Sequence, residues 1–144
     1  MRVFDCLVLN DELALLEERF RRLASVPEVT HVICEAEADE NGNPKPLHFL
    51  QTRMTRFLPW NGRWNHVMVQ ENEIAGILPG EYDHVLREEF MLLGFNGDPE
   101  DIILAGDIRC IPGPADVARL ASGEITPGKM PFTAACYRYQ SLIT

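Results

Sequence analysis

VFDCLVLNDELALLEERFRRL, residues 3–23, changes its hydrophobic period part-way along and thereby indicates the fold class. Residues 3–9 are a short apolar run, which predicts a buried strand. From Leu13 onward, apolar side chains recur at spacings of three and four residues, as in an amphipathic helix. Asn10 stands between the two segments and is a suitable N-cap. The stretch therefore predicts a strand that leads directly into a helix.

The rest of the chain repeats this alternation. Apolar runs predict further strands at residues 29–36 and 102–105, and a last strand within 132–139. Residues 64–69 predict a strand because Trp64, His66 and Met68 alternate with a second set of side chains, as on a strand with two different faces. Helical spacing predicts helices at residues 47–57, 82–93 and 117–120. The run 102–105 is apolar at every position, as expected for a strand covered on both faces. Strands separated by helices predict an α/β fold with a mostly parallel, Rossmann-like sheet, in a single domain over residues 1–144.

Composition limits the classes of partner. The formal net charge of −9 over 144 residues argues against nucleic acid and anionic membrane, which both favour basic surfaces. Neither a signal peptide nor a membrane span is visible, so a cytoplasmic protein is expected if this is the whole gene product. The four cysteines are far apart and form no Cys-x-x-Cys pair, which predicts reduced core thiols.

DIILAGDIRCIP, residues 101–112, places Asp107 just after an apolar strand. Ligands of α/β proteins gather at the carboxyl ends of strands, so Asp107 is a candidate to hold a metal ion or a ribose hydroxyl. A divalent cation normally needs more than one oxygen ligand. Residue 109 is an arginine, which has donors only. The stretch predicts a ligand site at which metal binding is strongly weakened.

Three segments, residues 10–20, 32–35 and 42–49, have the order and spacing found in one enzyme family. The chain resembles the bisecting N-acetylglucosaminyltransferases, that is, the β-1,4-mannosyl-glycoprotein N-acetylglucosaminyltransferases and their microbial relatives. The similarity resumes at residues 82–88 and 101–112, and it covers about residues 3 to 114. It implies a truncated fold of the glycosyltransferase A type that binds a nucleotide diphosphate sugar such as UDP-N-acetylglucosamine. It also implies transfer of the sugar to an acceptor hydroxyl.

The family carries an Asp-x-Asp-Glu-Ile-Pro motif, whose carboxylates usually hold Mn²⁺ or Mg²⁺ against the departing diphosphate. Here Asp107 matches the first Asp, and Ile111 and Pro112 match the end of the motif, but Arg109 and Cys110 replace the second Asp and the Glu. The resemblance therefore implies a degenerate motif in which Asp107 is the one remaining carboxylate for Mn²⁺ or Mg²⁺. Two interpretations stay open. Arg109 either binds phosphate directly, in a metal-independent site, or is a solvated loop residue in a site that has lost its chemistry.

Four further residues are candidates for the nucleotide-sugar site, and each has a plain structural alternative. Glu35 ends a strand and could contact a ribose or base, or it is a carboxylate at the sheet rim. Asn10 could face the nucleotide, although an N-cap explains it as well. Lys45 could reach a phosphate from its loop, or it is an exposed lysine. Arg87 matches a family position near the donor, but pairing with Asp83 four residues earlier explains it equally.

Three functions from different classes remain open. The chain is a small glycosyltransferase, a catalytically inactive descendant (a pseudoenzyme) that still binds a nucleotide sugar, or a structural or protein-interaction module. In the third case its acidic surface or an open sheet edge would bind a protein partner or a second copy of the chain. Fold inheritance does not decide among them, because function resides in the site.

Overall fold

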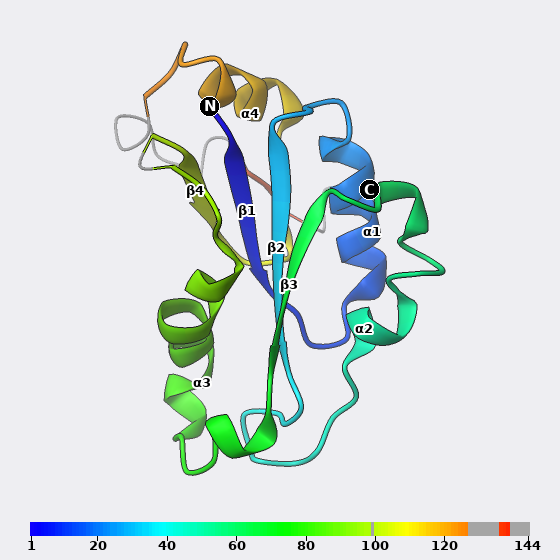
Figure 1. The fold of residues 1–144 in the computed structure, drawn as a ribbon, viewed down its shortest axis with the longest axis vertical. Coiled ribbons are helices and arrows are strands. Elements are labelled where there is room, and N and C mark those ends of the chain that lie inside the picture. Colours follow the sequence, from blue (N-terminus) through cyan, green and yellow to red (C-terminus); the bar gives the residue numbers. More distant parts are fainter. Residues whose placement is uncertain (99, 127–135, 139–144) are drawn as a thin grey trace.

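A computed structural model describes residues 1–98, 100–126 and 136–138 of the chain. Its centre is a four-stranded, all-parallel sheet with the spatial order β3-β2-β1-β4 (Figure 1). The strands are β1 (Val3–Val8), β2 (Val29–Ala36), β3 (Trp64–Val69) and β4 (Ile102–Ala105). All four lie within one residue of the predicted positions. The α/β class and the parallel sheet are therefore confirmed.

One face of the sheet is covered by α1 (Leu13–Leu23), α2 (His48–Thr52) and, near the amino ends of the strands, α4 (Pro114–Ala121) (Figure 1). The odd-numbered side chains of β1 point to this face, where Leu7 packs with Phe20 of α1 and Phe49 of α2. Figure 1 shows α1 running antiparallel to the strands on either side of it in sequence. This is the arrangement of a right-handed βαβ crossover.

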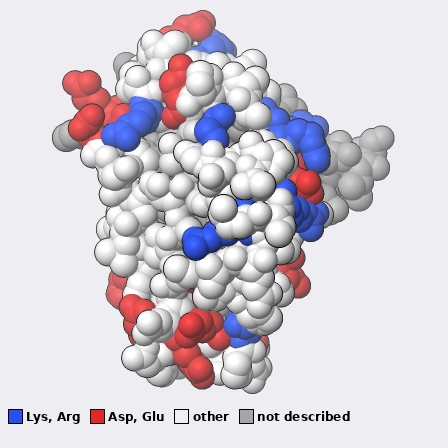
Figure 2. All heavy atoms as spheres, turned by 45° about the vertical axis from the view of Figure 1, so that its right-hand side comes forward, with Lys and Arg blue, Asp and Glu red and all other residues white. Residues whose placement is uncertain are grey.

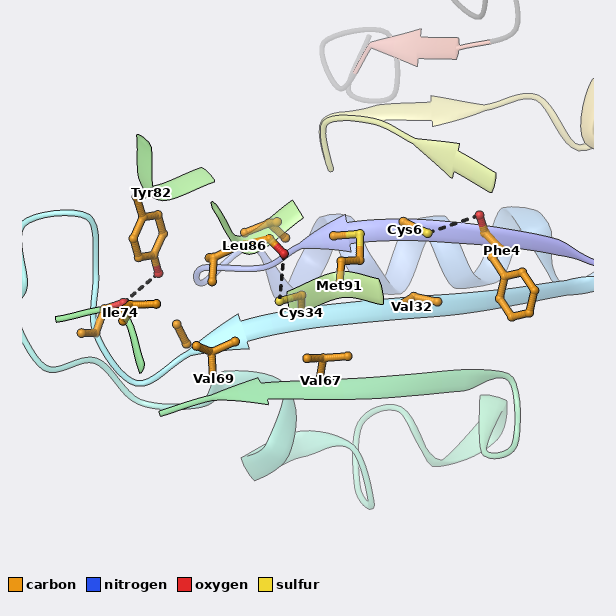
Figure 3. Packing of buried hydrophobic residues seen from close by; sticks show 13 residues of the cluster. Phe4, Cys6, Val32, Cys34, Val67, Val69, Ile74, Tyr82, Leu86 and Met91 are labelled. Atoms are coloured by element: carbon orange, nitrogen blue, oxygen red, sulfur yellow. Dashed lines mark hydrogen bonds between the residues drawn. The ribbon is translucent and has the colours of Figure 1, made fainter. Parts of the chain in front are cut away.

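The other face is covered by one continuous helical segment, residues 82–94. It comprises α3 (Tyr82–Val85), the π-helical η4 (Leu86–Phe90) and the 3-10 turn η5 (Met91–Gly94). Figure 3 shows Leu86 and Met91 of this segment packed over Cys34 of the sheet, whose thiol lies 3.9 Å from the Leu86 carbonyl oxygen. The helix predicted at residues 82–93 is thus present, with its hydrogen-bond pattern changing twice along its length.

Short 3-10 turns complete the connections. They are η1 (Leu58–Trp60), η2 (Glu71–Glu73) and η3 (Pro79–Glu81). After β4, the chain forms β5 (Cys110–Pro112), which pairs antiparallel with β6 (Cys136–Arg138). The predicted last strand at residues 132–139 is described only over β6, and its other positions lie outside the described residues.

Three local predictions were wrong. Asn10 is not the N-cap of α1: Glu12 occupies that position, and its carboxylate accepts the Asn10 amide at 2.9 Å. The helix predicted at 47–57 shrinks to α2, because two residues of the predicted stripe, Leu50 and Met54, are 38% and 58% exposed. Strand β4 is not covered on both faces. It lies at the edge of the sheet, and Ile103 is 50% exposed.

The thiols of Cys6 and Cys34 are free and buried, as predicted, while free Cys110 is half-buried. Burial raises the pKa of the Cys34 thiol to about 12, and the neighbouring Glu35 charge adds to this effect. Both core thiols are therefore protonated at neutral pH. No helix in the described part of the chain combines the length and the apolar character needed to span a membrane.

Candidate functional site

The strand order creates a switch point between β1 and β4. From β1 the chain builds the sheet outward through β2 and β3, and it then crosses back to add β4 on the other side of β1. The loops that leave β1 and β4, residues 9–12 and 106–109, therefore start side by side and diverge. Parallel α/β sheets bind ligands at such a point, outside the carboxyl ends of the strands. We call these two loops the switch-point edge.

A pocket of about 440 Å³ lies beside the switch-point edge. Two predicted site residues, Asn10 and Lys45, line it together. The other lining residues come from the ends of β1 and β2, the start of α2 and the start of α3: Val8, Asp11, Asp39, Glu40, Asn41, His48, Tyr82 and Asp83. Figure 2 shows acidic side chains gathered at the lower end of the molecule, where the loops after β2 and β3 lie. The pocket is accordingly rich in carboxylates, and Lys45 is the cation in its wall.

Asp107 and Arg109 form an exposed ion pair at the switch-point edge. The guanidinium donates from Nη2 to Oδ2 of Asp107 at 2.9 Å and from Nε to Oδ1 at 3.1 Å. The Arg109 backbone amide donates to the same Oδ1 at 2.8 Å. The side-chain hydrogen bond from Arg109 is the main cause that lowers the pKa of Asp107, and it raises the pKa of Arg109 in return. Both side chains remain more than half exposed, at 52% and 68%.

The residues of this edge do not fit a divalent cation. Both carboxylate oxygens of Asp107 are engaged by Arg109. Within residues 1–98, 100–126 and 136–138, no three His, Cys, Asp or Glu side chains are grouped in a way that would hold a metal ion. Mn²⁺ and Mg²⁺ need several oxygen ligands, whereas the group beside Asp107 is a guanidinium, which has donors only.

Arg87 lies close to the same edge. Its Nε donates to Oδ2 of Asp83 at 2.7 Å, so the pairing expected from the four-residue spacing is present. The Arg87 side chain is 24% exposed, and its charge contributes, after Arg109, to lowering the pKa of Asp107. Arg87 thus adds a second guanidinium beside the pocket wall at Asp83, and its charge acts on the carboxylate of Asp107.

Lys45 is half-buried in the loop after β2. Burial lowers its pKa, although the charges of Glu35, Glu12 and Asp11 oppose that shift. Its ammonium group donates to the Pro46 carbonyl at 3.2 Å. Lys45 therefore lines the pocket and is not simply an exposed lysine, which was the alternative interpretation from the sequence.

Glu35 lies near the end of β2, is completely buried and does not line the pocket. Its carboxylate accepts the backbone amides of Phe49 and Leu50 at 3.1 and 3.0 Å, which anchors the first turn of α2. Oε2 also lies 2.6 Å from Nε2 of His66 on β3, and the other ring nitrogen contacts Arg53 at 3.1 Å. Glu35 is thus not at an open rim, and its oxygens are occupied by the protein itself.

A second buried cluster was not predicted from the sequence. Arg19 of α1 pairs with Asp5 of β1 through two hydrogen bonds of 2.7 and 2.8 Å, and His31 of β2 lies 2.7 Å from the same carboxylate. Burial opposes ionisation of Asp5, but the charge of Arg19 and the hydrogen bond from His31 prevail and hold its pKa well below the usual range. The available signal was Asp5 itself, because a carboxylate inside an apolar strand requires a buried partner.

Five of the six predicted nucleotide-sugar residues therefore lie at or beside the switch-point edge: Asn10, Lys45, Arg87, Asp107 and Arg109. Comparison with known protein families, curated proteins and solved structures found no match. Function is consequently inferred from the chemistry of this edge.

Proposed function

We propose that the switch-point edge binds a nucleotide diphosphate sugar of the UDP-N-acetylglucosamine type, with Arg109 and Arg87 contacting the diphosphate in place of a metal ion. The observation that carries this proposal is an exposed guanidinium at the point where a parallel sheet reverses its strand order. The resemblance to the bisecting transferases supports the same ligand. In this proposal the sheet is a truncated glycosyltransferase A-type domain.

Arg109 can reach phosphate at little cost. Asp107 engages Nε and Nη2, which leaves Nη1 without a hydrogen-bond partner in the described part of the chain. An exposed ion pair contributes only about 0–1 kcal/mol. A diphosphate therefore competes easily with Asp107 for the guanidinium, and the planar fork of arginine suits two phosphate oxygens at once.

The carboxylate-rich pocket suits the hydroxyl groups of the ligand. Ribose and hexose hydroxyls donate to carboxylates, as in the acidic residue that binds the ribose of dinucleotides. Asp11, Asp39 and Asp83 supply such acceptors, and Asn10 adds an amide that can donate or accept. The volume of about 440 Å³ falls within the ordinary range for small-molecule sites. Lys45 completes the pocket with a positive charge near the phosphates.

Sugar transfer would require two further elements, a bound acceptor and a general base. A second pocket of about 440 Å³ shares Asp39, Glu40, Asn41 and Tyr82 with the first, and Ile74 and Ile77 are among its lining residues. We assign the acceptor to this pocket. A base would be one of the carboxylates in the shared wall, and the two arginines would stabilise the departing diphosphate.

A catalytically inactive descendant that only binds the nucleotide sugar is the second candidate. The observation that favours it is the double engagement of Asp107 by Arg109, which occupies the carboxylate that would hold a metal in the active family. Donor hydrolysis by the wild type that disappears in Arg109→Ala at saturating donor would select the transferase. Tight binding without turnover would select the inactive descendant.

The binding proposal is tested by titrating UDP-N-acetylglucosamine into the wild type, Arg109→Ala and Arg87→Ala. Each substitution removes charge-assisted hydrogen bonds of about 1.5–3 kcal/mol, so we expect roughly tenfold to hundredfold weaker binding. Arg21→Ala is the matched control, because Arg21 is an exposed α1 arginine paired with Glu17 and Glu18. Equal affinity of Arg109→Ala and Arg21→Ala would refute the proposed role of Arg109.

A further inference from the structure

Arg19 connects the buried core to the switch-point edge. On one side its guanidinium donates to Asp5 from Nε and Nη2. On the other side Nη1 points to backbone carbonyls of the turn after β4, at 2.7 Å to Cys110, 3.4 Å to Ile108 and 3.5 Å to Asp107. One side chain, 2% exposed, thus binds both a core carboxylate and the turn that carries the candidate site.

We propose that Arg19 is a positioning residue that fixes the 107–110 turn and so directs the side chains of Asp107 and Arg109 outward. Three carbonyl groups of the turn converge on a single buried nitrogen. Because these carbonyls face inward, the polar side chains between them lie on the solvent side, where they are 52% and 68% exposed. The orientation of Arg109 toward a phosphate therefore depends on a residue that no ligand touches.

The guanidinium is itself held firmly. Asp5 lies on β1 and His31 on β2, and both are anchored in the central sheet. A buried arginine is tolerated only when its donors are paired. No buried side-chain nitrogen or oxygen in the described part of the chain lacks a hydrogen-bond partner. The turn is thus tied to a rigid, fully paired charge cluster rather than to a flexible surface contact.

Arg63 provides a matched comparison at the opposite end of the sheet. Its guanidinium also donates to backbone carbonyls, those of Ala24, Val26 and Val29 among them. These carbonyls lie in the connection from α1 to β2, away from the switch-point edge. Substituting Arg63 removes the same kind of interaction without touching the 107–110 turn.

The test uses Cys110 as a reporter of the turn. Arg19→Lys and Arg63→Lys are made in a Cys136→Ser background, and the rate of Cys110 alkylation by iodoacetamide is measured together with the affinity for UDP-N-acetylglucosamine. Cys6 and Cys34 are buried, and burial raises the pKa of both thiols, so they do not react on the same timescale. Lysine keeps a positive charge beside Asp5 but cannot reach the carbonyls with a second nitrogen.

We expect Arg19→Lys to remain folded by circular dichroism, to alkylate Cys110 on the order of tenfold faster, and to bind the nucleotide sugar on the order of tenfold more weakly. Arg63→Lys should leave both measurements within about twofold of the background protein. An unchanged alkylation rate in folded Arg19→Lys would overturn the inference. If Arg19→Lys does not fold, the charge-free pair Asp5→Asn with Arg19→Gln takes its place, with the same two outcomes.

The effect on affinity rests on the proposed function, whereas the effect on the turn does not. If the wild type binds no nucleotide sugar, the proposed function fails, and Cys110 alkylation alone still decides whether Arg19 positions the turn. If the wild type binds and Arg19→Lys changes neither the alkylation rate nor the affinity, the positioning role fails while the proposed function stands.

Discussion

Replacing Glu35 by alanine should destabilise the fold, because this carboxylate holds the protein together rather than facing a ligand. Its two oxygens accept the amides of Phe49 and Leu50 at 3.1 and 3.0 Å and lie 2.6 Å from Nε2 of His66. Glu35 is completely buried, so water does not reach these partners in the native state. The substitution therefore leaves two amides and an imidazole without their acceptor.

The magnitude follows from that count. Single hydrogen bonds to a charged group contribute about 1.5–3 kcal/mol, but the three share one carboxylate and do not add fully. Leaving a buried donor without its acceptor costs about 1–3 kcal/mol, and three donors lose the same acceptor here, so we take about 3–5 kcal/mol as the expected loss for Glu35→Ala. Domains of this kind are stable by about 5–15 kcal/mol, so the variant should still fold. With a urea slope of about 2 kcal/mol/M, the unfolding midpoint should fall by about 2 M.

Urea unfolding followed by circular dichroism measures this directly, with Glu37→Ala as the matched control. Glu37 follows the same strand but is exposed, and among the described residues its carboxylate accepts a single hydrogen bond, from the Glu71 amide at 3.3 Å. Its substitution should change the unfolding free energy by less than about 0.5 kcal/mol. Wild-type stability in Glu35→Ala, combined with weaker binding of UDP-N-acetylglucosamine, would show that the carboxylate faces the ligand.

Three other perturbations test separate parts of the structure. Burial lowers the pKa of His31, although the hydrogen bond and charge of Asp5 oppose this shift. The free energy of unfolding should therefore fall as the pH drops below about 6.5, where the ring takes up a proton in the unfolded chain but not in the folded one. Urea unfolding at several pH values measures this, and His31→Gln should flatten that part of the profile. Gly94→Ala would place a Cβ atom 2.5 Å from Cγ1 of Val32, so thermal unfolding should show a loss of about 1–3 kcal/mol, relieved in part by Val32→Ala. Ile103→Gln, on the uncovered face of β4, should shift the thermal midpoint by an amount equivalent to less than about 0.5 kcal/mol, whereas a larger loss would mean that this face is covered.

Strands β1, β2 and β4 were predictable because each is a short apolar run, and β3 was predictable because its side chains alternate between two different faces. Neither pattern needs information from elsewhere in the chain. The extent of α2 was not predictable in this way. Leu50 and Met54 continue a helical period, but the buried aromatic residue is Phe49, which is out of phase with them. The start of α2 is fixed by a carboxylate 14 residues away in sequence. The hydrophobic period of residues 47–57 cannot indicate this hydrogen bond between Glu35 and the Phe49 amide.

The sequence predicted at which edge of the sheet the candidate site lies, but not which strands are neighbours there. Asn10 and Asp107 follow apolar strands, and the carboxyl ends of parallel strands meet at one side of a sheet. The sequence pattern does not contain the strand order, so it could not indicate that β1 and β4 are neighbours. Nor could it indicate that Glu35 points inward to His66, or that Arg19 reaches the 107–110 turn, because those partners are 31 and about 90 residues away.

Metal-independent binding of a nucleotide sugar at the switch-point edge is the central claim, and one calorimetric titration tests it directly. UDP-N-acetylglucosamine is titrated into the wild-type protein in excess EDTA, and then again after dialysis into Mn²⁺. Because Arg109 engages both carboxylate oxygens of Asp107, the two dissociation constants should agree within about threefold, a difference of less than about 0.7 kcal/mol. Binding that appears only with Mn²⁺, or no binding at millimolar ligand in either buffer, would contradict the claim.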